Sequence, residues 1–221
     1  TKEEVIGQTL SEKGLSSKRE QFLAIDSQIL DDGKEVLCEG ALLMDGVHTK
    51  AILTRKNRFI DPTGRNFLVG VIYDITERKQ TELRERSRSN VLELITSGET
   101  LLVILEAIVH AVEQENPSML CSVLLLDDTG RYLVSGAASS LPNFYNEAIN
   151  GLEIGIGAGS CGTAAFTNKR VVVDDIQTHP YWESFKKLAQ QAGVAACWSE
   201  PIRSTQGKVL GTFAIYHYQI N

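Results

Sequence analysis

Residues 193–217, GVAACWSEPIRSTQGKVLGTFAIYH, decide the fold of the C-terminal half of the chain. Two apolar runs flank the polar segment STQGK, a pattern that is typical of a β-hairpin. Side chains alternate along a strand, so Trp198 points to the opposite side from Cys197 and Ser199, and one of these sides faces a core. Gly193 suits the position that follows a helix, which predicts that YWESFKKLAQQAG is helical.

The segments before this hairpin alternate between helix and strand. The motif Thr96-Ser97-Gly98-Glu99 fits a capping box, so a new helix is expected to begin there. Apolar residues at helical spacing continue this helix to about Glu115, and Pro117 ends it. The runs LCSVLLLD and RYLVSGAA predict two strands around a turn, and NFYNEAI predicts a short helix. The glycine-rich stretch GIGAGSCGTAAF leads into a small helix at residues 162–166, and RVVVDDI predicts a further strand.

This order of elements resembles that of a GAF domain. The resemblance is carried by CSVLLLDDTG, by LPNFYNEAINGLEIGIGAGSCGTAAFTNKRVVVDDIQTHPYW and by the hairpin quoted above. It implies a GAF domain over residues 98–221, with the glycine-rich stretch crossing one face of an antiparallel sheet and walling a cavity. The stretches are similar to GAF domains that lie upstream of GGDEF and EAL domains, which make and break cyclic-di-GMP, and to GAF domains in some sensor histidine kinases.

The N-terminal part of the chain predicts a helix followed by three strands. Phe22, Ile25 and Ile29 lie at helical spacing, and the apolar runs after them are joined by an Asp-Gly turn and a PTGR turn. The stretches EEVIGQTL, DPTGR and GVIYDITERK resemble the closing half of a PAS domain. The resemblance implies a PAS-like domain over residues 1–76 that lacks its first strands.

Residues 77–97 predict a connector helix that is rich in charge and poor in apolar side chains. Leu83, Val91 and Leu94 form at most a narrow apolar seam. Two interpretations stay open, because a polar helix is marginal in water unless a second helix lies beside it. The helix is either a lone solvated connector or pairs with its copy in a parallel homodimer, and the prediction favours the homodimer.

Taken together, these patterns predict an α+β protein of two domains, each an antiparallel sheet with helices packed on it, joined by a helical linker. The net charge of −6 argues against a nucleic-acid partner, since phosphate binding needs a basic face. The sequence contains no apolar run of membrane-spanning length, so no direct membrane insertion is expected. Four widely spaced cysteines indicate free thiols in a reducing compartment, which predicts a cytoplasmic location.

The glycine-rich stretch permits three kinds of chemistry. A phosphate loop is disfavoured because the P-loop spacing fails and the first lysine after these glycines is Lys169. A reactive thiol is supported by Cys161, which lies at the start of the expected helix, with Cys197 as the second redox candidate. If the stretch instead forms the wall of a pocket, its glycines would let the backbone cross close to the sheet. The candidate pocket residues are Gly159, Ser160, Cys161, Thr163, His179, Tyr181, Trp182, Phe185 and Trp198.

The predicted function is a sensory module of a bacterial signalling protein that binds a small ligand or senses redox state. It would pass the signal through the dimeric helix to a C-terminal output domain in cis, a diguanylate cyclase or cyclic-di-GMP phosphodiesterase. No catalytic residue and no metal site is predicted, because no metal-ligand spacing occurs; the cofactor is unknown, and haem or another small molecule stays open. The alternatives are a thiol-based enzyme related to free methionine-(R)-sulfoxide reductase, which has a similar CGTAA stretch, and the sensor region of a histidine kinase.

Overall fold

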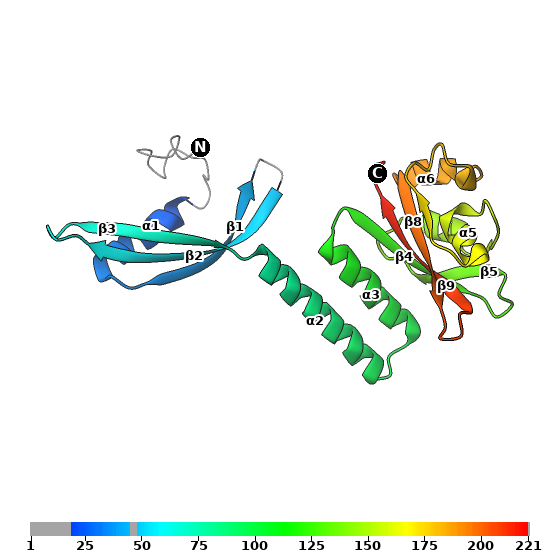
Figure 1. Cartoon of the computed structure of the whole chain (residues 1–221), viewed down its shortest axis with the longest axis horizontal. Helices are drawn as coiled ribbons and strands as arrows, with labels where there is room; N and C mark the ends of the chain where they lie inside the picture. Colours follow the sequence, from blue (N-terminus) through cyan, green and yellow to red (C-terminus); the bar gives the residue numbers. More distant parts are fainter. Residues whose placement is uncertain (1–18, 45–47, 221) are drawn as a thin grey trace. The chain divides into compact units, whose positions relative to one another are not determined.

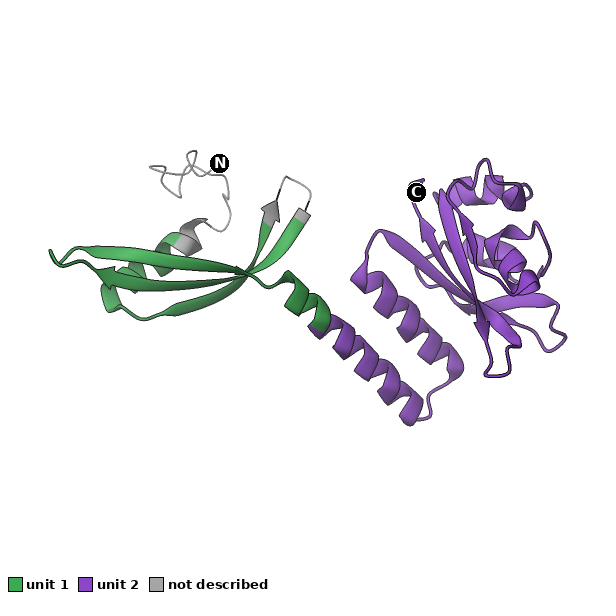
Figure 2. Cartoon of the chain, viewed as in Figure 1, with its two compact units in different colours: residues 1–81 green, residues 82–221 purple. Residues whose placement is uncertain are grey.

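Two antiparallel sheets, one of three strands and one of six, organise the described part of the chain (Figure 1). The computed structural model describes residues 19–44 and 48–220. Contacts divide the chain into unit 1, Thr1–Thr81, and unit 2, Glu82–Asn221 (Figure 2). No helix in the described part is both long and apolar enough to span a bilayer.

Unit 1 is a β-meander with one helix packed against it. Its elements are α1 (Arg19–Asp32), β1 (Val36–Met44), β2 (His48–Ile60) and β3 (Asn66–Asp74), and the strands lie in the order β1-β2-β3. Lys56 on β2 forms an ion pair with Asp26 on α1 at 2.5 Å, and Ile29 of α1 is fully buried. The predicted helix and meander are therefore confirmed, whereas EEVIGQTL and the Asp45-Gly46 turn lie outside the described residues.

Unit 2 contains part of the long helix α2 and a six-stranded sheet. The elements are α2 (Thr76–Thr96), α3 (Leu101–Glu115), β4 (Met119–Leu126), β5 (Tyr132–Ala137), α4 (Asn143–Ile149), β6 (Leu152–Glu153), α5 (Gly159–Thr167), β7 (Val171–Val173), the 3-10 helix η2 (Pro180–Trp182), α6 (Lys186–Ala192), β8 (Ala196–Arg203) and β9 (Val209–His217). The sheet order is β6-β5-β4-β9-β8-β7. The hairpin predicted over residues 193–217 is the β8–β9 pair, and it lies beside β4 near the middle of this sheet.

Helices cover both faces of the six-stranded sheet (Figure 1). On one face α4, α5, η2 and α6 enclose a large apolar core that contains Tyr145, Trp182 and Tyr216. On the other face Leu105 and Val109 of α3 pack on β4 and β5. Burial on two sides explains why β4 is a nearly continuous apolar run rather than an alternating one.

Two boundaries differ from the sequence-based expectation. The small helix begins at Gly159 rather than at residue 162, which brings Cys161 into its first turn. Thr96 ends α2 instead of capping the next helix; the N-cap of α3 is Thr100, whose hydroxyl accepts the Val103 N–H at 3.5 Å. Gly98 between them adopts a left-handed φ of +77°, which a side chain would strain.

Candidate functional site

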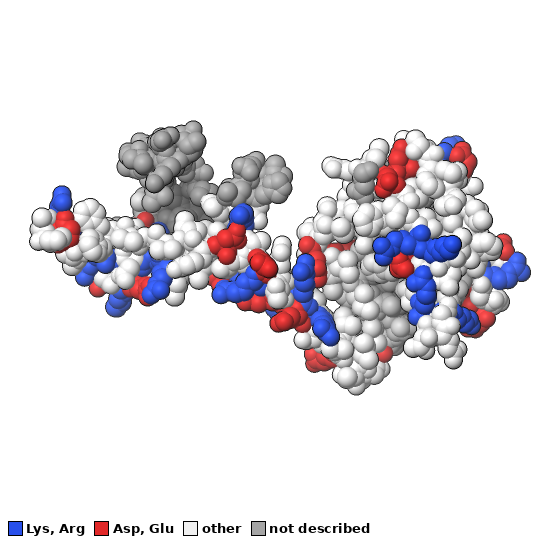
Figure 3. All heavy atoms as spheres, in the orientation of Figure 1, with Lys and Arg blue, Asp and Glu red and all other residues white. Residues whose placement is uncertain are grey.

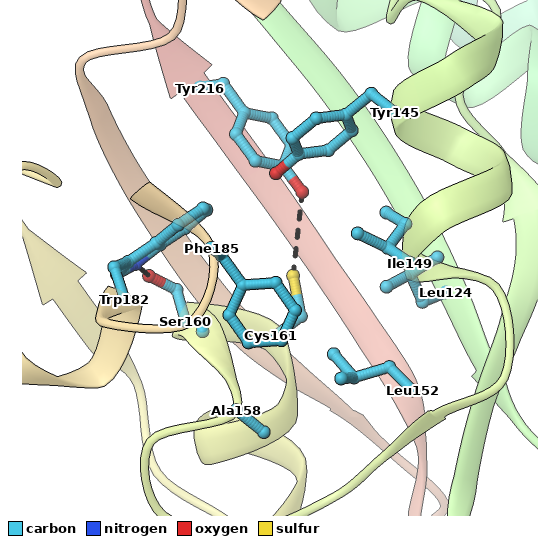
Figure 4. A pocket seen from close by; sticks show the side chains of 11 residues that line it. Leu124, Tyr145, Ile149, Leu152, Ala158, Ser160, Cys161, Trp182, Phe185 and Tyr216 are labelled. Atoms are coloured by element: carbon cyan, nitrogen blue, oxygen red, sulfur yellow. Dashed lines mark hydrogen bonds between the residues drawn. The ribbon is translucent and has the colours of Figure 1, made fainter. Parts of the chain in front are cut away.

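The first turn of α5 forms one wall of a small pocket above the sheet (Figure 4). The residues that line it are Leu124, Tyr145, Ile149, Leu152, Ala158, Gly159, Ser160, Cys161, Trp182, Phe185 and Tyr216. The cavity measures about 20 Å³, which is room for roughly one water molecule. The site is therefore nearly filled by its own side chains, and most of its lining is apolar.

Backbone geometry explains the glycines at the start of α5. Gly159 has a left-handed φ of +62°, and a Cβ there would lie 4.0 Å from the Trp182 ring. Thr163 fixes the preceding loop, because its hydroxyl donates to the Gly155 carbonyl and accepts the Gly157 N–H, both at 3.2 Å. The loop can thus lie close to the sheet and bring Ser160 and Cys161 into the core.

Ser160 joins three elements around the pocket. Its hydroxyl accepts the indole N–H of Trp182 at 2.9 Å and donates to the Cys197 carbonyl at 3.4 Å. Both side chains are buried, so these hydrogen bonds satisfy polar groups that would otherwise be costly in the core. The arrangement ties α5 to η2 and to β8.

The Cys161 sulfur points toward a polar patch on the floor of the pocket (Figure 4). It lies 3.7 Å from the Tyr216 hydroxyl, which is 3.2 Å from the Ser122 hydroxyl. Tyr145 packs edge-on against Tyr216, with ring centroids 5.8 Å apart. A thiol and several hydroxyl groups are therefore gathered inside an otherwise apolar core.

These donors favour the ionised form of Cys161. A hydrogen bond from the Cys197 thiol, with further ones from the hydroxyls of Ser199, Tyr216 and Thr212, lowers the pKa of Cys161 to about 7 despite its burial. Burial raises the pKa of Cys197, so Cys197 stays a protonated donor. Within the described residues, the buried Ser199 and Thr212 hydroxyls have no hydrogen-bond partner other than the Cys161 sulfur. The site can therefore hold a thiolate without a neighbouring cation.

The structure brings five of the predicted pocket residues together: Gly159, Ser160, Cys161, Trp182 and Phe185 all line the cavity. The second redox candidate, Cys197, lies directly behind Cys161 and is fully buried.

The other four predicted residues lie outside the cavity lining. Thr163 holds the loop, and Tyr181 packs at the margin of the core. His179 caps η2, because its Nδ1 accepts the Tyr181 N–H at 3.2 Å. Trp198 faces the opposite side of the sheet and is 40% exposed, because strand alternation turns Cys197 and Ser199 inward instead.

Sequence reasoning missed six lining residues: Leu124, Tyr145, Ile149, Leu152, Ala158 and Tyr216. It also missed the inward hydroxyls of Ser122, Ser199 and Thr212. The alternation of the β8–β9 hairpin carried a signal for two of these, because Ser199 and Tyr216 lie on the same side of their strands as Cys197. No local sequence signal placed Tyr145 in the pocket, because the sequence of a short helix does not show which sheet the helix covers.

Within residues 19–44 and 48–220, no cluster of three or more His, Cys, Asp or Glu side chains is arranged to hold a metal ion. The chemistry that the pocket offers is that of an activated thiol and of hydroxyl donors beneath an apolar cavity.

Sequence comparison gives two matches of different scope. Residues 98–221 match the family model described as the GAF domain. A 147-residue stretch is 44% identical to the methyl sulfide methyltransferase-associated sensor of Methanosarcina acetivorans. That stretch is 66% of this chain but only 15% of the relative, so the chain spans a small part of that protein.

Solved structures share the fold at low sequence identity. The GAF domain of a phosphoenolpyruvate-protein phosphotransferase from Coxiella burnetii is 19% identical, with a TM-score of 0.50 over 64% of this chain and 79% of that one. The free methionine-R-sulfoxide reductase of Neisseria meningitidis, solved with its substrate, is 18% identical, with a TM-score of 0.47 over 64% and 74% of the two chains. The first similarity supports the α+β fold of unit 2.

Proposed function

Because residues 98–221 make this chain a member of the GAF domain family, we propose that it is the sensory module of a signalling protein and that the pocket above Cys161 is its input site. The sensor name of the Methanosarcina relative supports the same role. The input is either a small ligand in the cavity or a change in the redox state of the Cys161 thiol.

The size of the cavity carries this proposal. A space of about 20 Å³ holds one water molecule, whereas ligand pockets have volumes of about 300–1,000 Å³. Any larger ligand must displace side chains of the pocket wall, such as Trp182, Phe185 or Tyr145. Binding would therefore move η2 or α4, and a ligand that favours the moved arrangement shifts the population of the domain toward it.

Hydrogen bonds join the loop before α4 to α3, and join α3 to the connector helix. Ser140, just before α4, donates to Glu113 Oε2 on α3 at 2.5 Å, and the Cys121 N–H donates to Glu113 Oε1 at 2.7 Å. Two residues further along α3, Glu115 accepts a hydrogen bond from Arg84 on α2 at 2.9 Å. A shift of α4 would thus act on α3 and then on α2.

The connector helix would transmit the signal as a homodimer to an output domain that follows in cis. On the family resemblance, this output is a diguanylate cyclase or a cyclic-di-GMP phosphodiesterase, with a sensor histidine kinase as the alternative. Unit 1 would be the closing part of a PAS domain, in agreement with its helix and three-stranded meander. The two units described here would perform no catalysis themselves.

Native mass spectrometry of the freshly purified chain tests the ligand input. We expect bound mass that is released on denaturation, is lost in Leu152→Trp, which fills the cavity, and is retained in the control Trp198→Ala. The redox input is tested in parallel by treating the chain with hydrogen peroxide and following tryptophan fluorescence, with Cys161→Ser as the control. A chain that carries no bound mass and gives no Cys161-dependent fluorescence change contradicts the proposal.

The neighbouring thiols of Cys161 and Cys197 favour a second candidate, a thiol-based reductase. The resemblance to free methionine-(R)-sulfoxide reductase is incomplete, because only Trp198 separates Cys197 from the Ser199-Glu200 pair, whereas that family places several residues there. We expect no turnover of methionine-(R)-sulfoxide in the presence of a thiol reductant. Turnover that is lost in Cys161→Ser would contradict the sensor proposal and support the reductase instead.

A further inference from the structure

Cys161 and Cys197 bring two thiols together between α5 and the sheet of unit 2. On the sheet, Cys197 of β8 is the register partner of Tyr216 of β9, and the Cys161 sulfur lies 3.7 Å from the Tyr216 hydroxyl. The Cys197 thiol also donates a hydrogen bond to the Cys161 sulfur. The two sulfur atoms are therefore in contact, although they come from different elements of the fold.

The two thiols differ in reactivity and in access. The hydrogen bond from Cys197, with those from three hydroxyls, lowers the pKa of Cys161 to about 7, whereas burial raises the pKa of Cys197. Cys161 lines the cavity, while Cys197 does not and is fully buried. A thiolate at a cavity with a protonated thiol behind it is the arrangement of a redox-sensing cysteine and its resolving partner.

The size of the cavity limits which oxidant can reach Cys161. Its volume of about 20 Å³ is room for roughly one water molecule. Hydrogen peroxide is only slightly larger than water, whereas an organic hydroperoxide carries an alkyl or aryl group that does not fit. The cavity therefore favours hydrogen peroxide over larger peroxides.

The lining of the cavity also favours an uncharged oxidant. None of its residues is Lys, Arg, His, Asp or Glu, and most of its walls are apolar. Figure 3 shows charged side chains on one face of unit 2, so charge is present at the surface of the domain but not among the residues that line the cavity. An anionic oxidant would lose its hydration there without gaining a cation, which is costly.

We propose that hydrogen peroxide enters this cavity and oxidises Cys161, and that Cys197 then forms a disulfide bond with it. The inference rests on the proposed function, in which the pocket above Cys161 is the input site, and it names the oxidant and the second sulfur. The bond would join the first turn of α5 to β8. Ser160 on that turn accepts the indole N–H of Trp182 at 2.9 Å, so the change would reach η2.

The chemistry balances in two steps. The Cys161 thiolate attacks one oxygen of the peroxide, so that a sulfur–oxygen bond forms, the oxygen–oxygen bond breaks, and the departing hydroxide takes a proton from solvent to become water. The Cys197 sulfur then attacks the sulfenic acid on Cys161, so that the disulfide bond forms and the sulfur–oxygen bond breaks. The hydroxide leaves with the Cys197 proton as a second water. Two electrons pass from the two thiols to one peroxide.

Mass spectrometry of the full chain tests the disulfide. We expect the reduced chain to lose the mass of two hydrogen atoms on treatment with hydrogen peroxide. Peptide mapping without reductant should identify the pair as Cys161 and Cys197, which requires no variant. The control Cys38→Ser, in unit 1, should form the same disulfide.

Variants separate the roles of the two cysteines. Cys197→Ser should stop the reaction at the sulfenic acid, which adds one oxygen to Cys161 and is trapped by dimedone. Cys161→Ser should leave Cys197 unmodified, because Cys197 is buried and protonated. Circular dichroism of each variant confirms that it is folded.

A comparison of peroxides tests the size limit. We expect cumene hydroperoxide to form the disulfide at least tenfold more slowly than hydrogen peroxide at the same concentration. Leu152→Ala removes part of the cavity wall and should reduce this difference. The matched control Leu210→Ala, on a side chain that is 44% exposed and does not line the cavity, should leave it unchanged.

Three results would overturn the inference: a wild-type chain in which Cys161 and Cys197 stay unlinked, a disulfide to Cys38 or Cys121 instead, and equal rates with the two peroxides. A Cys161-dependent fluorescence change without the disulfide would contradict this inference and leave the proposed function standing. A disulfide that forms without any fluorescence change, in a chain that carries no bound mass, would contradict the proposed function instead.

Discussion

The two sheets of this chain are built from similar apolar strands but differ in how they are covered. In unit 2 helices lie on both faces, and five consecutive residues of β4 are buried. In unit 1 eight of the nine residues of β3 are exposed, among them Phe67, Val69 and Tyr73 at 43–49%. Local sequence is thus enough to form a strand, but only burial between layers gives the strand a core.

Among the expected effects on stability, the largest should come from removing a large side chain of the pocket in unit 2. Trp182→Ala deletes a buried ring together with its hydrogen bond to Ser160, so we expect a loss of about 3–5 kcal/mol in the free energy of unfolding. The matched change in unit 1, Tyr73→Ala, removes a ring that is 47% exposed and should cost less than about 1 kcal/mol. Urea denaturation followed by circular dichroism measures both, and equal losses would contradict the comparison.

Strand glycines give the second test. A Cβ on Gly211 of β9 would overlap the carbonyl oxygen of Leu124 on β4, so Gly211→Ala should force the strands apart at a cost of up to about 3 kcal/mol. On β3 a Cβ at Gly70 would meet Lys56 Cγ at an ordinary 3.7 Å, and Gly70→Ala should change stability by less than about 0.5 kcal/mol. Thermal unfolding of both variants would show whether the packing differs as described.

The buried thiol of unit 2 predicts a dependence of stability on pH. The pKa of Cys161 is lowered from 9.0 to about 7 in the folded chain, so ionisation stabilises the fold above pH 7 and this contribution is complete near pH 9. It should reach about 3 kcal/mol above pH 9, decline as the pH falls from 9, and be lost once the pH has fallen through 7. Chemical denaturation at several pH values measures it. Cys161→Ala should abolish the rise, whereas Cys38→Ser in unit 1 should not; a rise that persists in Cys161→Ala would refute the assignment.

The smallest effects concern two hairpin turns that the units share. DPTGR at residues 61–65 and DDTGR at 127–131 place an aspartate so that it accepts hydrogen bonds from the threonine hydroxyl and from backbone N–H groups. These bonds, the threonine hydroxyl first, lower the pKa of Asp61 to about 2 and also lower the pKa of Asp127. Thr63→Val and Thr129→Val should raise the respective carboxyl pKa values, as followed by NMR titration.

Both turns should respond in the same direction although their sheets are covered differently. If only the turn of unit 2 responded, the turn geometry would depend on packing, and the distinction between local structure and burial would fail.

The order of helices and strands could be predicted from sequence because periodicity and turn residues are local signals. The meander, the β8–β9 hairpin and the helix ending at Glu115 all carried such signals. The cap of α3 was missed because Thr96 and Thr100 both offer a hydroxyl, and the left-handed φ of Gly98 selects the second. Local sequence could not show which residues of α3 would face the open groove between α2 and α3, which Val91 and Ile108 help to line.

Half of the pocket could also be predicted, because Gly159, Ser160 and Cys161 are adjacent in sequence and Trp182 and Phe185 follow closely. The other half depends on which strands and helices meet in space. Tyr145 on α4 and Tyr216 on β9 are far apart in the chain, and their contact is visible only after folding. Trp198 was assigned to the pocket because aromatic side chains line cavities, but its position on the strand turns it away.

The buried hydroxyls of Ser199 and Thr212 indicate a conflict between the thermal stability of the domain and its function. Below pH 7 Cys161 is a protonated thiol and a weak acceptor, so the two hydroxyls are poorly partnered there, and Ser199→Ala and Thr212→Val should make the domain more resistant to heat at that pH. Natural proteins commonly forgo such improvements where activity depends on the costly group. At these two positions, the substitutions that raise thermal stability are therefore expected to impair sensing.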